Sequence, residues 1–401
     1  MAKVIRKHWQ SEASAGLSRK DRQSCEYEAY VPDPLMGRAI VLEGAVAADV
    51  ADAEAAITRL NLEATALVDT EALARLLLRA ESVASSKIEG LEIGPRRLLE
   101  AEAMVYAVRS VRSDEELTLE QLLEIHRRLL AGSRLEESGG KIRSAQNWIG
   151  GSSYNPCSAA FVPPPPELVH DLLLDLCRFC NDESLPAVVQ TALAHAQFET
   201  IHPFADGNGR TGRALIHLTL RRRGLAPRVL PPVSLVLATW ATDYVAALEG
   251  TRYRGQPASP AAHEGLNRWV GLFATACRRA VDDATEFAAR TRGLEAAWRQ
   301  RLGAVRANSA TDLLLHALPG APVLTVRSAA DLISRSLRAT NEAIARLSEA
   351  EVLTQVTVGR RNRAFEAREL IDVFTDLERQ LASPRGDTRV APPSRRVPRR
   401  R

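Results

Sequence analysis

The sequence predicts a mainly helical protein with more than one domain. Three observations lead to this prediction: leucine- and alanine-rich stretches recur with helical spacing, aromatic residues make up only 5% of the chain, and 401 residues exceed what one small core requires. A hydrophobic content of 45% with 25% charged residues is typical of a chain that packs a core, which excludes a disordered protein and a membrane channel.

The sequence shows no sign of export or membrane insertion. No run of 18 apolar residues occurs, and the opening MAKVIRKHWQSEASAG lacks the apolar centre of a signal peptide. We therefore expect a cytoplasmic protein without membrane contact. Because an odd number of cysteines in such a chain argues against a disulfide framework, all five are expected to be thiols: Cys25, Cys157, Cys177, Cys180 and Cys277.

Helical periodicity divides the chain into segments. Residues 1–115 are predicted to form an N-terminal helical region, in which TEALARLLLRAESVASSKIEG ends at Gly90, a residue typical of helix C-caps. Residues 116–280 form a central helical core that is interrupted by a loop rich in Gly, Ser, Asn and Pro. The helices expected in this core cover residues 117–132, 167–181, 185–199, 209–223, 233–249 and 264–302.

A connecting helix over residues 281–310 leads to a separate C-terminal segment, residues 311–380. Its order of three helices, two short β-rich pieces around GRRNR and a closing helix resembles a winged helix. The last residues, 381–401, contain seven arginines and one aspartate, a composition typical of a disordered basic tail.

The stretch HPFADGNGRTGR, residues 202–213, has the residue types of a phosphate site. Gly207 and Gly209 lack a Cβ, so the backbone there can approach an anion closely. A helix is expected to begin at the same point, and its unpaired amides and positive dipole end add to the site. The two arginines, Arg210 and Arg213, lie three apart on one helix face, where their guanidinium groups can hold terminal phosphate oxygens.

Two further side chains in this stretch suit metal-dependent chemistry on a phosphate. Asp206 supplies a carboxylate just ahead of the helix, and one carboxylate with phosphate oxygens is a common way to hold Mg²⁺. His202 has an ordinary pKa of about 6.5, so its imidazole can accept a proton from an incoming hydroxyl at neutral pH. Together these residues predict a phosphate site in which a carboxylate can hold Mg²⁺ and an imidazole can accept the proton of a hydroxyl.

The same stretch resembles the Fic-domain proteins, because it matches their signature HxFx(D/E)GNGRxxR at every specified position. The sequences AHAQFETIHPF, QNWIGG and FVPPPPELV around it are also similar, so the resemblance covers residues 116–280. It implies a helical core with a short β-hairpin flap, residues 148–161, which aligns a segment of the target protein by strand addition.

This resemblance implies that the chain transfers AMP from ATP to Ser, Thr or Tyr hydroxyls of target proteins and of itself, with Mg²⁺ as cofactor. It makes His202 the base, Asp206 the Mg²⁺ ligand, Arg210 the contact for the β-phosphate and Arg213 the contact for the γ-phosphate. The ATP-binding residues it implies are Gly207, Asn208, Gly209, Arg210, Thr211, Gly212, Arg213 and Tyr244.

Tyr244 is the one residue that we assign to the adenine pocket, and a partly buried helical aromatic explains it equally well. If the pocket prefers another base, the transferred group becomes UMP or GMP while the mechanism at the phosphates stays the same. The sequence leaves this choice open.

An upstream motif resembles the inhibitory motif (S/T)xxxE(G/N) of the same family. Ser85 and Glu89 lie four apart in SSKIEG and thus on one face of a helix. The resemblance implies that the Glu89 carboxylate pairs with Arg213 and repels the γ-phosphate, which restrains transfer. The same glutamate is a candidate for helping water to remove AMP from a modified protein.

A different class of function remains open, namely a DNA-binding regulator whose central core only senses nucleotide. The arginine-rich GRRNR piece and the basic tail suit duplex contact, but the expected recognition helix TNEAIARLSEAE carries acidic residues that repel phosphate. We therefore favour a docking or dimer module for residues 311–380, and a homodimer stays open.

Overall fold

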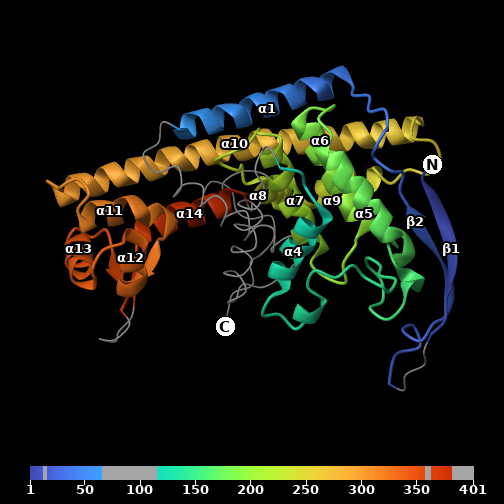
Figure 1. The fold of residues 1–401 in the computed structure, drawn as a ribbon, viewed down its shortest axis with the longest axis horizontal. Coiled ribbons are helices and arrows are strands. Elements are labelled where there is room, and N and C mark those ends of the chain that lie inside the picture. Colours follow the sequence, from blue (N-terminus) through green and yellow to red (C-terminus); the bar gives the residue numbers. More distant parts are fainter. Residues whose placement is uncertain (12–15, 66–114, 357–362, 382–401) are drawn as a thin grey trace. The chain divides into compact units, whose positions relative to one another are not determined.

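The computed structural model describes residues 1–11, 16–65, 115–356 and 363–381 (Figure 1). These residues are mainly helical with a few short strands, which confirms the predicted fold class. No helix within these ranges combines the length and apolar character needed to cross a membrane. The chain divides into two compact units. The first comprises Met1–Ala55, Ser85–Pro227 and Ala241–Ala276, and the second Ala56–Ala84, Arg228–Trp240 and Cys277–Arg401.

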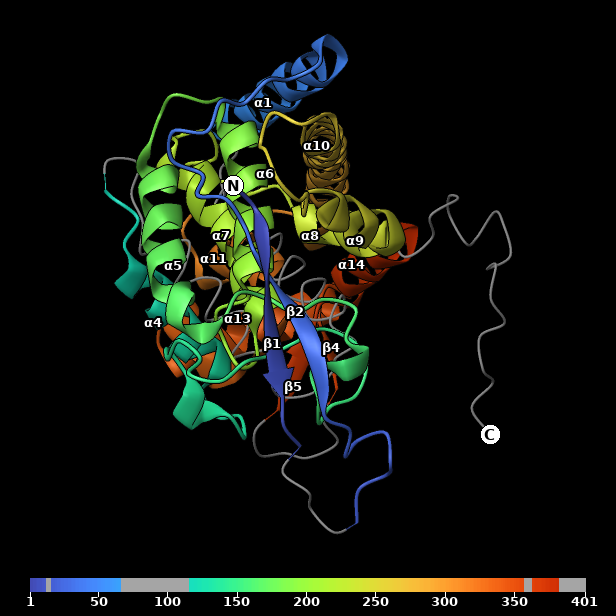
Figure 2. The same ribbon diagram turned by 90° about the vertical axis from the view of Figure 1, so that its right-hand side faces the viewer.

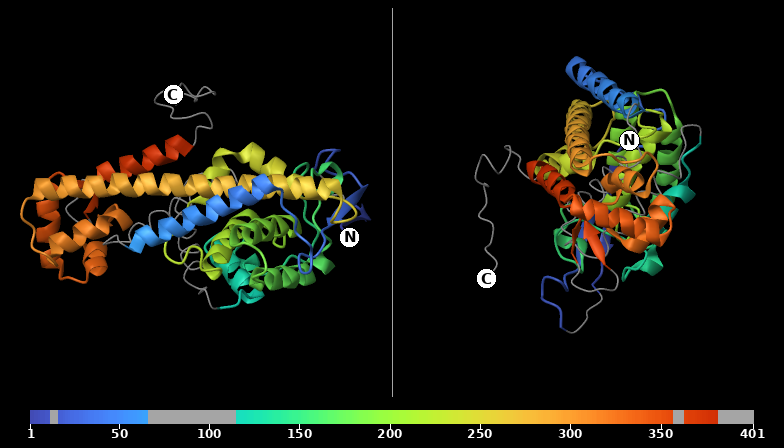
Figure 3. Two further views of the ribbon diagram at one scale, coloured as in Figure 1. Left: turned by 90° about the horizontal axis from the view of Figure 1, so that it is seen from above. Right: turned by 90° about the vertical axis from the view of Figure 1, so that its left-hand side faces the viewer.

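Two helices contribute residues to both units. They are α1 (Gly44–Thr65) and α10 (Pro260–Leu302), the latter a continuous 43-residue helix (Figure 3). The expected boundary between a core ending at 280 and a connecting helix at 281–310 falls inside α10, close to the division between the two units at Ala276 and Cys277. The apolar periodicity runs through that point, and the helix ends only before Gly303, which has a left-handed backbone (φ 66°).

The first unit begins with a β-hairpin, which the predicted N-terminal helical region, residues 1–115, did not include. Strands β1 (Lys3–Trp9) and β2 (Cys25–Val31) pair antiparallel, from Lys3 opposite Val31 to Trp9 opposite Cys25 (Figure 2). Their sequences, KVIRKHW and CEYEAYV, are rich in the branched and aromatic residues that favour strands over helices.

The helical core of this unit is centred on α6 (Ala187–Ile201), all of whose fifteen residues are buried. A helix that is buried around its whole circumference has neighbours on every side, and α5 (Pro166–Asn181) and α7 (Asn208–Arg222) pack against it. The remaining helical elements of this unit are α4 (Leu119–Leu130), η1 (Glu136–Ser138), η2 (Pro156–Ser158) and α9 (Ala241–Gly250).

The segment predicted as the flap, residues 148–161, forms less of a hairpin than expected. A single antiparallel bridge joins Ile149 to Phe161, with the Ile149 N–H donating to the Phe161 carbonyl at 2.8 Å. Between them lie Gly150 and Gly151, both with positive φ, and the 3-10 helix η2. These turn residues shorten the paired region to its base.

A disulfide joins β2 to this segment. Cys25 and Cys157 are bonded although 132 residues separate them, so the prediction that all cysteines are thiols is wrong for this pair. The hairpin brings the two residues together, and no local spacing in the sequence reveals that. The other three, Cys177, Cys180 and Cys277, are buried thiols as expected.

The second unit contains the C-terminal elements in nearly the predicted order. A three-stranded antiparallel sheet has the order β3-β5-β4 and lies with several helices around Trp298, Leu314, Leu347 and Phe365. The assignment of this segment as a winged helix stays a prediction. The elements are α8 (Val233–Thr239), α11 (Ala310–Ala317), η3 (Leu318–Gly320), β3 (Val323–Thr325), α12 (Val326–Ile333), α13 (Leu337–Glu349), β4 (Thr354–Gln355), β5 (Ala364–Glu366) and α14 (Arg368–Leu381). The expected basic tail lies outside the described residues.

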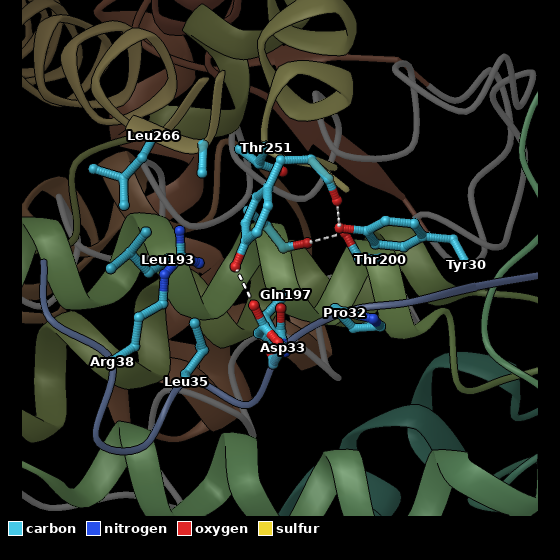
Figure 4. A pocket seen from close by; sticks show the side chains of 13 residues that line it. Tyr30, Pro32, Asp33, Leu35, Arg38, Leu193, Gln197, Thr200, Thr251 and Leu266 are labelled. Atoms are coloured by element: carbon cyan, nitrogen blue, oxygen red, sulfur yellow. Dashed lines mark hydrogen bonds between the residues drawn. The ribbon is translucent and has the colours of Figure 1, made fainter. Parts of the chain in front are cut away.

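A small cavity lies in the first unit between the end of β2 and α6 (Figure 4). Tyr30 donates to the Tyr253 carbonyl at 2.7 Å, and the Tyr253 hydroxyl donates to the Asp33 carboxylate at 2.5 Å. These two hydrogen bonds anchor the hairpin to the core. The cavity has a volume of about 30 Å³, which suits a water molecule and is too small for a nucleotide.

Candidate functional site

The candidate site is built on the turn between α6 and α7. α6 ends at His202, whose backbone is left-handed (φ 49°), and the His202 N–H still donates to the Phe198 carbonyl at 2.9 Å. Gly207 is also left-handed (φ 74°) and caps the N-terminus of α7, a conformation that glycine adopts without steric cost. These two residues place the end of α6 and the start of α7 on the wall of one cavity.

The side chain of Asn208 closes this turn. Its Oδ1 accepts from the Phe204 N–H and its Nδ2 donates to the Phe204 carbonyl, both at 2.8 Å. Asn147 adds further bonds from its Nδ2, to the carbonyls of Phe204 at 3.0 Å and of His202 at 3.2 Å. The Asn208 side chain thus fixes the loop, while its backbone belongs to the first turn of α7.

His126 of α4 supports the turn from the other side. Its ring stacks on Phe204 with 3.7 Å between centroids, and its Nδ1 accepts from the Gly140 N–H at 3.0 Å. Because Nδ1 accepts, the proton is on Nε2, which donates to the Asp206 carbonyl at 2.9 Å. Burial lowers the pKa of His126 to about 4, so the ring is neutral at neutral pH.

Arg143 holds the end of α6, although its surroundings in the sequence did not predict it as a site residue. Its Nε donates to the His202 carbonyl at 2.9 Å, and its Nη2 contacts the Ile201 carbonyl at 3.4 Å. The Arg143 N–H also donates to the Pro203 carbonyl at 2.9 Å. The residue is only 6% exposed, and burial lowers the pKa of its guanidinium to about 10. The sequence around Arg143, KIRSAQNW, contains no pattern that predicts its contact with the end of α6.

A cavity of about 430 Å³ opens beside the turn. Its volume lies within the range of small-molecule sites. The turn and α7 contribute His202, Ala205, Asp206, Gly207, Asn208, Gly209 and Arg213 to its wall. The rest of its lining comes from the flap ends, α6, α9 and the residue Arg252: Ile149, Ala160, Phe161, Glu199, Tyr244, Val245, Leu248, Glu249 and Arg252.

The electrostatics of the cavity favour a neutral His202. Burial of the ring lowers its pKa to about 4, and the nearby positive charge of Arg143 acts in the same direction. At neutral pH the imidazole therefore carries one ring nitrogen without a proton, which is the form that a general base requires.

Asp206 is the carboxylate that suits a divalent ion. Half of its side chain is exposed, and its Oδ1 accepts from the Gly207 N–H at 2.7 Å. Among the described residues, no group of three or more His, Cys, Asp or Glu side chains could enclose a metal. One carboxylate at the edge of a cavity of this size fits Mg²⁺, which keeps several waters and binds phosphate oxygens.

The two arginines of the motif differ in position. Arg213 is 2% exposed and lines the cavity. Arg210 is 6% exposed, and its Nη2 lies 3.7 Å from Asp206 Oδ2. Arg213 therefore belongs to the cavity wall, whereas Arg210 lies beside the Asp206 carboxylate and does not line the cavity.

Besides Arg210, two residues predicted to bind nucleotide, Thr211 and Gly212, do not line the cavity. The Thr211 hydroxyl is buried and donates to the Gly207 carbonyl at 2.9 Å, inside the first turn of α7. Gly212 faces α6, where a Cβ would lie 2.5 Å from Glu199 Oε1. Both residues shape the start of α7 and its contact with α6.

Tyr244 lines the cavity, but its hydroxyl is bonded to the protein. His195 Nδ1 lies 2.8 Å from the Gly212 carbonyl, so Nδ1 carries the proton and Nε2 accepts from the Tyr244 hydroxyl at 2.8 Å. Tyr244 is 3% exposed, so it offers a ring edge or face to a ligand rather than its hydroxyl. Its role in base recognition stays a prediction.

Arg252 lines the cavity and was not predicted from the sequence. Its guanidinium carbon lies 3.6 Å from the centroid of the Phe161 ring, at the base of the flap. Burial lowers the pKa of Arg252, and its charge acts on His202 by lowering the pKa of that ring as well. A single arginine beyond α9 carries no recognisable motif. The predicted inhibitory residues, Ser85 and Glu89, lie outside the described residues.

Known proteins are similar to the part of the chain that contains this site. Residues 116–220 match the Fic/DOC family, and residues 47–119 match the Fic/DOC family N-terminal region. Protein adenylyltransferase fic-1 of Caenorhabditis briggsae is 32% identical over 174 residues, which are 43% of this chain and 32% of that protein. Protein adenylyltransferase Fic of Drosophila grimshawi is 41% identical over 135 residues, 32% of this chain and 25% of that protein. The chain spans about a third or less of these curated relatives.

Two solved structures also align with the chain. A Fic family protein from Desulfovibrio desulfuricans G20 aligns with a TM-score of 0.48 and 20% identity, over 82% of this chain and 97% of that chain. Fic-1 from C. elegans aligns with a TM-score of 0.42 and 24% identity, over 62% of this chain and 74% of that chain.

Proposed function

The chain belongs to the Fic/DOC family through residues 47–220, and from this premise we propose that it is a protein adenylyltransferase. It transfers AMP from ATP to Ser, Thr or Tyr hydroxyls of target proteins and of itself. The observation that carries the proposal is the convergence of a neutral imidazole, a carboxylate, a helix N-terminus and an arginine on one cavity: His202, Asp206, Gly209 and Arg213.

The proposed reaction starts at His202. Its unprotonated ring nitrogen accepts the proton of the target hydroxyl, whose oxygen attacks the α-phosphorus of ATP. The new P–O bond forms as the bond to the bridging oxygen of pyrophosphate breaks, and pyrophosphate leaves with the electron pair. The products are an AMP-modified side chain, pyrophosphate and the proton on His202, which returns to solvent.

The protein stabilises the charge that develops at the α-phosphate through the start of α7. The first amides of a helix have no intrahelical acceptor, and the helix dipole favours an anion there. The Gly207 N–H already donates to Asp206 Oδ1, so the amides that follow it, at Asn208 and Gly209, are the donors that we assign to the phosphate. In other enzymes, one such preorganised donor is worth about 3–4 kcal/mol.

Asp206 is the residue that would hold Mg²⁺, and Mg²⁺ would supply positive charge to the phosphates. Arg213, buried at the cavity wall, is placed to bind the γ-phosphate. Arg210 reaches the β-phosphate only if its contact with Asp206 opens when the nucleotide binds. These roles follow from the residue types of the motif and from which of these residues line the cavity.

We also propose that Glu89 restrains the enzyme. A carboxylate that pairs with Arg213 would occupy the charge meant for the γ-phosphate, and the i, i+4 spacing of Ser85 and Glu89 supports this idea. Replacement of Glu89 by glycine should raise AMP transfer strongly. Loss of AMP removal in Glu89→Gln would assign the reverse hydrolysis to the same residue, and equal transfer by wild type and Glu89→Gly would end the inhibitory role.

Intact mass spectrometry tests the proposed reaction. The Glu89→Gly chain is incubated with Mg²⁺ and each of the four nucleoside triphosphates in turn, with Glu89→Gly/His202→Ala as the matched control. A gain of one nucleoside monophosphate that His202→Ala abolishes identifies both the reaction and the base. A chain that gains no mass with any nucleotide, alone or with candidate target proteins, would refute the proposal, as would a gain that persists in His202→Ala.

A further inference from the structure

The loop of the β1–β2 hairpin lies directly against the flap. We call residues 16–24 the hairpin loop. The Ser152 hydroxyl donates to Asp21 Oδ1 at 2.6 Å, and Asn155 Nδ2 donates to the carbonyls of Lys20 and Asp21, both at 3.0 Å. Each of these bonds joins residues more than 130 positions apart, so the two segments meet only in the folded chain.

Covalent and aromatic contacts add to these hydrogen bonds. The Cys25–Cys157 disulfide ties the end of the hairpin loop to η2. At the base of the flap, Trp9 and Trp148 pack edge to face with 5.3 Å between ring centroids. The disulfide and the hydrogen bonds therefore hold the hairpin loop against the flap.

The two segments differ in charge. The flap, WIGGSSYNPCSAAF, contains no charged residue. The hairpin loop contains three cations, Arg19, Lys20 and Arg22, whose side chains are exposed. Its only carboxylate, Asp21, is turned to the flap, where it accepts from the hydroxyls of Ser152 and Ser18. The exposed face of the hairpin loop is therefore basic.

The flap connects this basic face to the candidate site. Its ends, Ile149 and Phe161, line the 430 Å³ cavity together with His202, while its middle contacts the hairpin loop. Tyr154, in this middle part, is 54% exposed. A polypeptide that lies along the flap and places a hydroxyl at His202 thus extends toward the cations.

We propose that the hairpin loop and the flap form one docking surface that selects acidic acceptor segments. The uncharged flap offers backbone pairing to any sequence, and Arg19, Lys20 and Arg22 attract Asp or Glu residues that flank the modified hydroxyl. The inference rests on the proposed function, because it assigns the acceptor class of that same site. A polypeptide is favoured over nucleic acid because the surface continues into the cavity that holds the hydroxyl-activating imidazole.

Charge reversal at the surface provides the test. Arg19→Glu/Arg22→Glu is compared with Lys3→Glu/Arg6→Glu, which reverses two exposed charges on β1 of the same hairpin, outside the loop. Both are made in the Glu89→Gly chain. The probes are synthetic peptides with one Ser, one Thr and one Tyr, flanked by Glu, Gln or Lys residues.

The unaltered surface should give the lowest KM with the Glu-flanked peptide. Arg19→Glu/Arg22→Glu should raise that KM about tenfold, since two attractive charge contacts become repulsive. The KM for ATP, the kcat and the KM for the Gln-flanked peptide should stay unchanged, as should every value in the control. Equal KM values for the three peptides, or an equal change in the control, would overturn the inference.

Peptide binding without nucleotide separates this inference from the proposed function. Fluorescence anisotropy of the labelled peptides should show tighter binding of the Glu-flanked peptide, lost in Arg19→Glu/Arg22→Glu and retained in the control, whether or not AMP transfer occurs. Loss of the chain's binding to a labelled DNA duplex in the same variant, without loss of peptide binding, would instead assign the surface to nucleic acid and refute an acceptor role.

Discussion

The Nε atom of Arg143 donates a hydrogen bond to the carbonyl oxygen of His202 at 2.9 Å. The same guanidinium group also donates to the carbonyl oxygens of Ala145 and Pro164. The last carbonyl groups of a helix have no hydrogen-bond donor within the helix. Here the buried guanidinium group of Arg143 donates to them at the end of α6, next to the proposed base His202. The position of His202 therefore depends on a residue 59 positions earlier in the chain.

Replacement of Arg143 by methionine should weaken both folding and catalysis. It leaves several buried carbonyls without a donor, which should lower the free energy of unfolding by about 2–4 kcal/mol, and it frees the His202 backbone to shift, which should lower kcat at least about tenfold. Arg143→Lys keeps the charge but not the planar guanidinium group, so its free energy of unfolding and its kcat should lie between those of the wild type and Arg143→Met. Urea denaturation and initial rates of AMP transfer measure these effects, and unchanged values in Arg143→Met would contradict the assigned role.

Stability should fall as the pH drops below neutrality. Burial lowers the pKa of His126 to about 4 and that of His195 to about 3, from 6.5 in the unfolded chain. The unfolded state therefore binds protons first, so stability is full above about pH 6.5 and is lost progressively as the pH falls, down to about pH 4 for His126 and about pH 3 for His195. Each histidine contributes a slope of up to about 1.4 kcal/mol per pH unit. Urea denaturation between pH 5 and 8 measures how the free energy of unfolding changes with pH. His195→Gln should flatten this dependence, and replacement of the exposed His170 by Gln should not.

The rate of AMP transfer should not fall between pH 8 and 6. An unperturbed histidine base would lose half its activity near pH 6.5, whereas His202 has a pKa lowered to about 4 and stays deprotonated in this range. The acid limb of kcat/KM should lie well below pH 6. A midpoint at 6.5 would show that the ring is not buried in the way that the structure describes.

Two glycines should respond in opposite ways to alanine. At Gly212 a Cβ would lie 2.5 Å from Glu199 Oε1 and 3.0 Å from the Phe198 ring, so Gly212→Ala should displace these buried side chains and cost about 1–3 kcal/mol. Gly293 is exposed on α10, where an added Cβ would meet nothing within 4 Å, and Gly293→Ala should stabilise by up to about 1 kcal/mol. Thermal unfolding distinguishes the two, and a stabilised Gly212→Ala would refute the close approach of the helices.

Alkylation should distinguish the disulfide-bonded cysteines from the buried thiols. In the native chain without reductant, iodoacetamide should label none of the cysteines rapidly, because Cys25 and Cys157 are bonded and burial raises the pKa of Cys177 to about 12 and also raises that of Cys180. After brief reduction, peptide mapping should find label at Cys25 and Cys157 only. Rapid labelling of these two before reduction would contradict the disulfide.

The helical segments were predictable because their signals are local. The expected helices at 167–181, 185–199 and 209–223 agree with α5, α6 and α7 to within about two residues, since apolar spacing, prolines and glycines mark each one. The N-terminal hairpin was missed although its strands are rich in branched and aromatic residues. Its partner strands are separated by a long loop that gives no turn signal.

The sequence by itself determined the candidate motif and the turn that it forms, because residues 202–213 are contiguous and a left-handed turn followed by a helix needs only local residue types. Tertiary structure decided what supports that motif. Arg143, His126 and Arg252 reach it from three other segments, and Cys25 meets Cys157 across 132 residues. Such contacts depend on how helices and strands pack against one another, and packing leaves no spacing pattern in the chain that could reveal them beforehand.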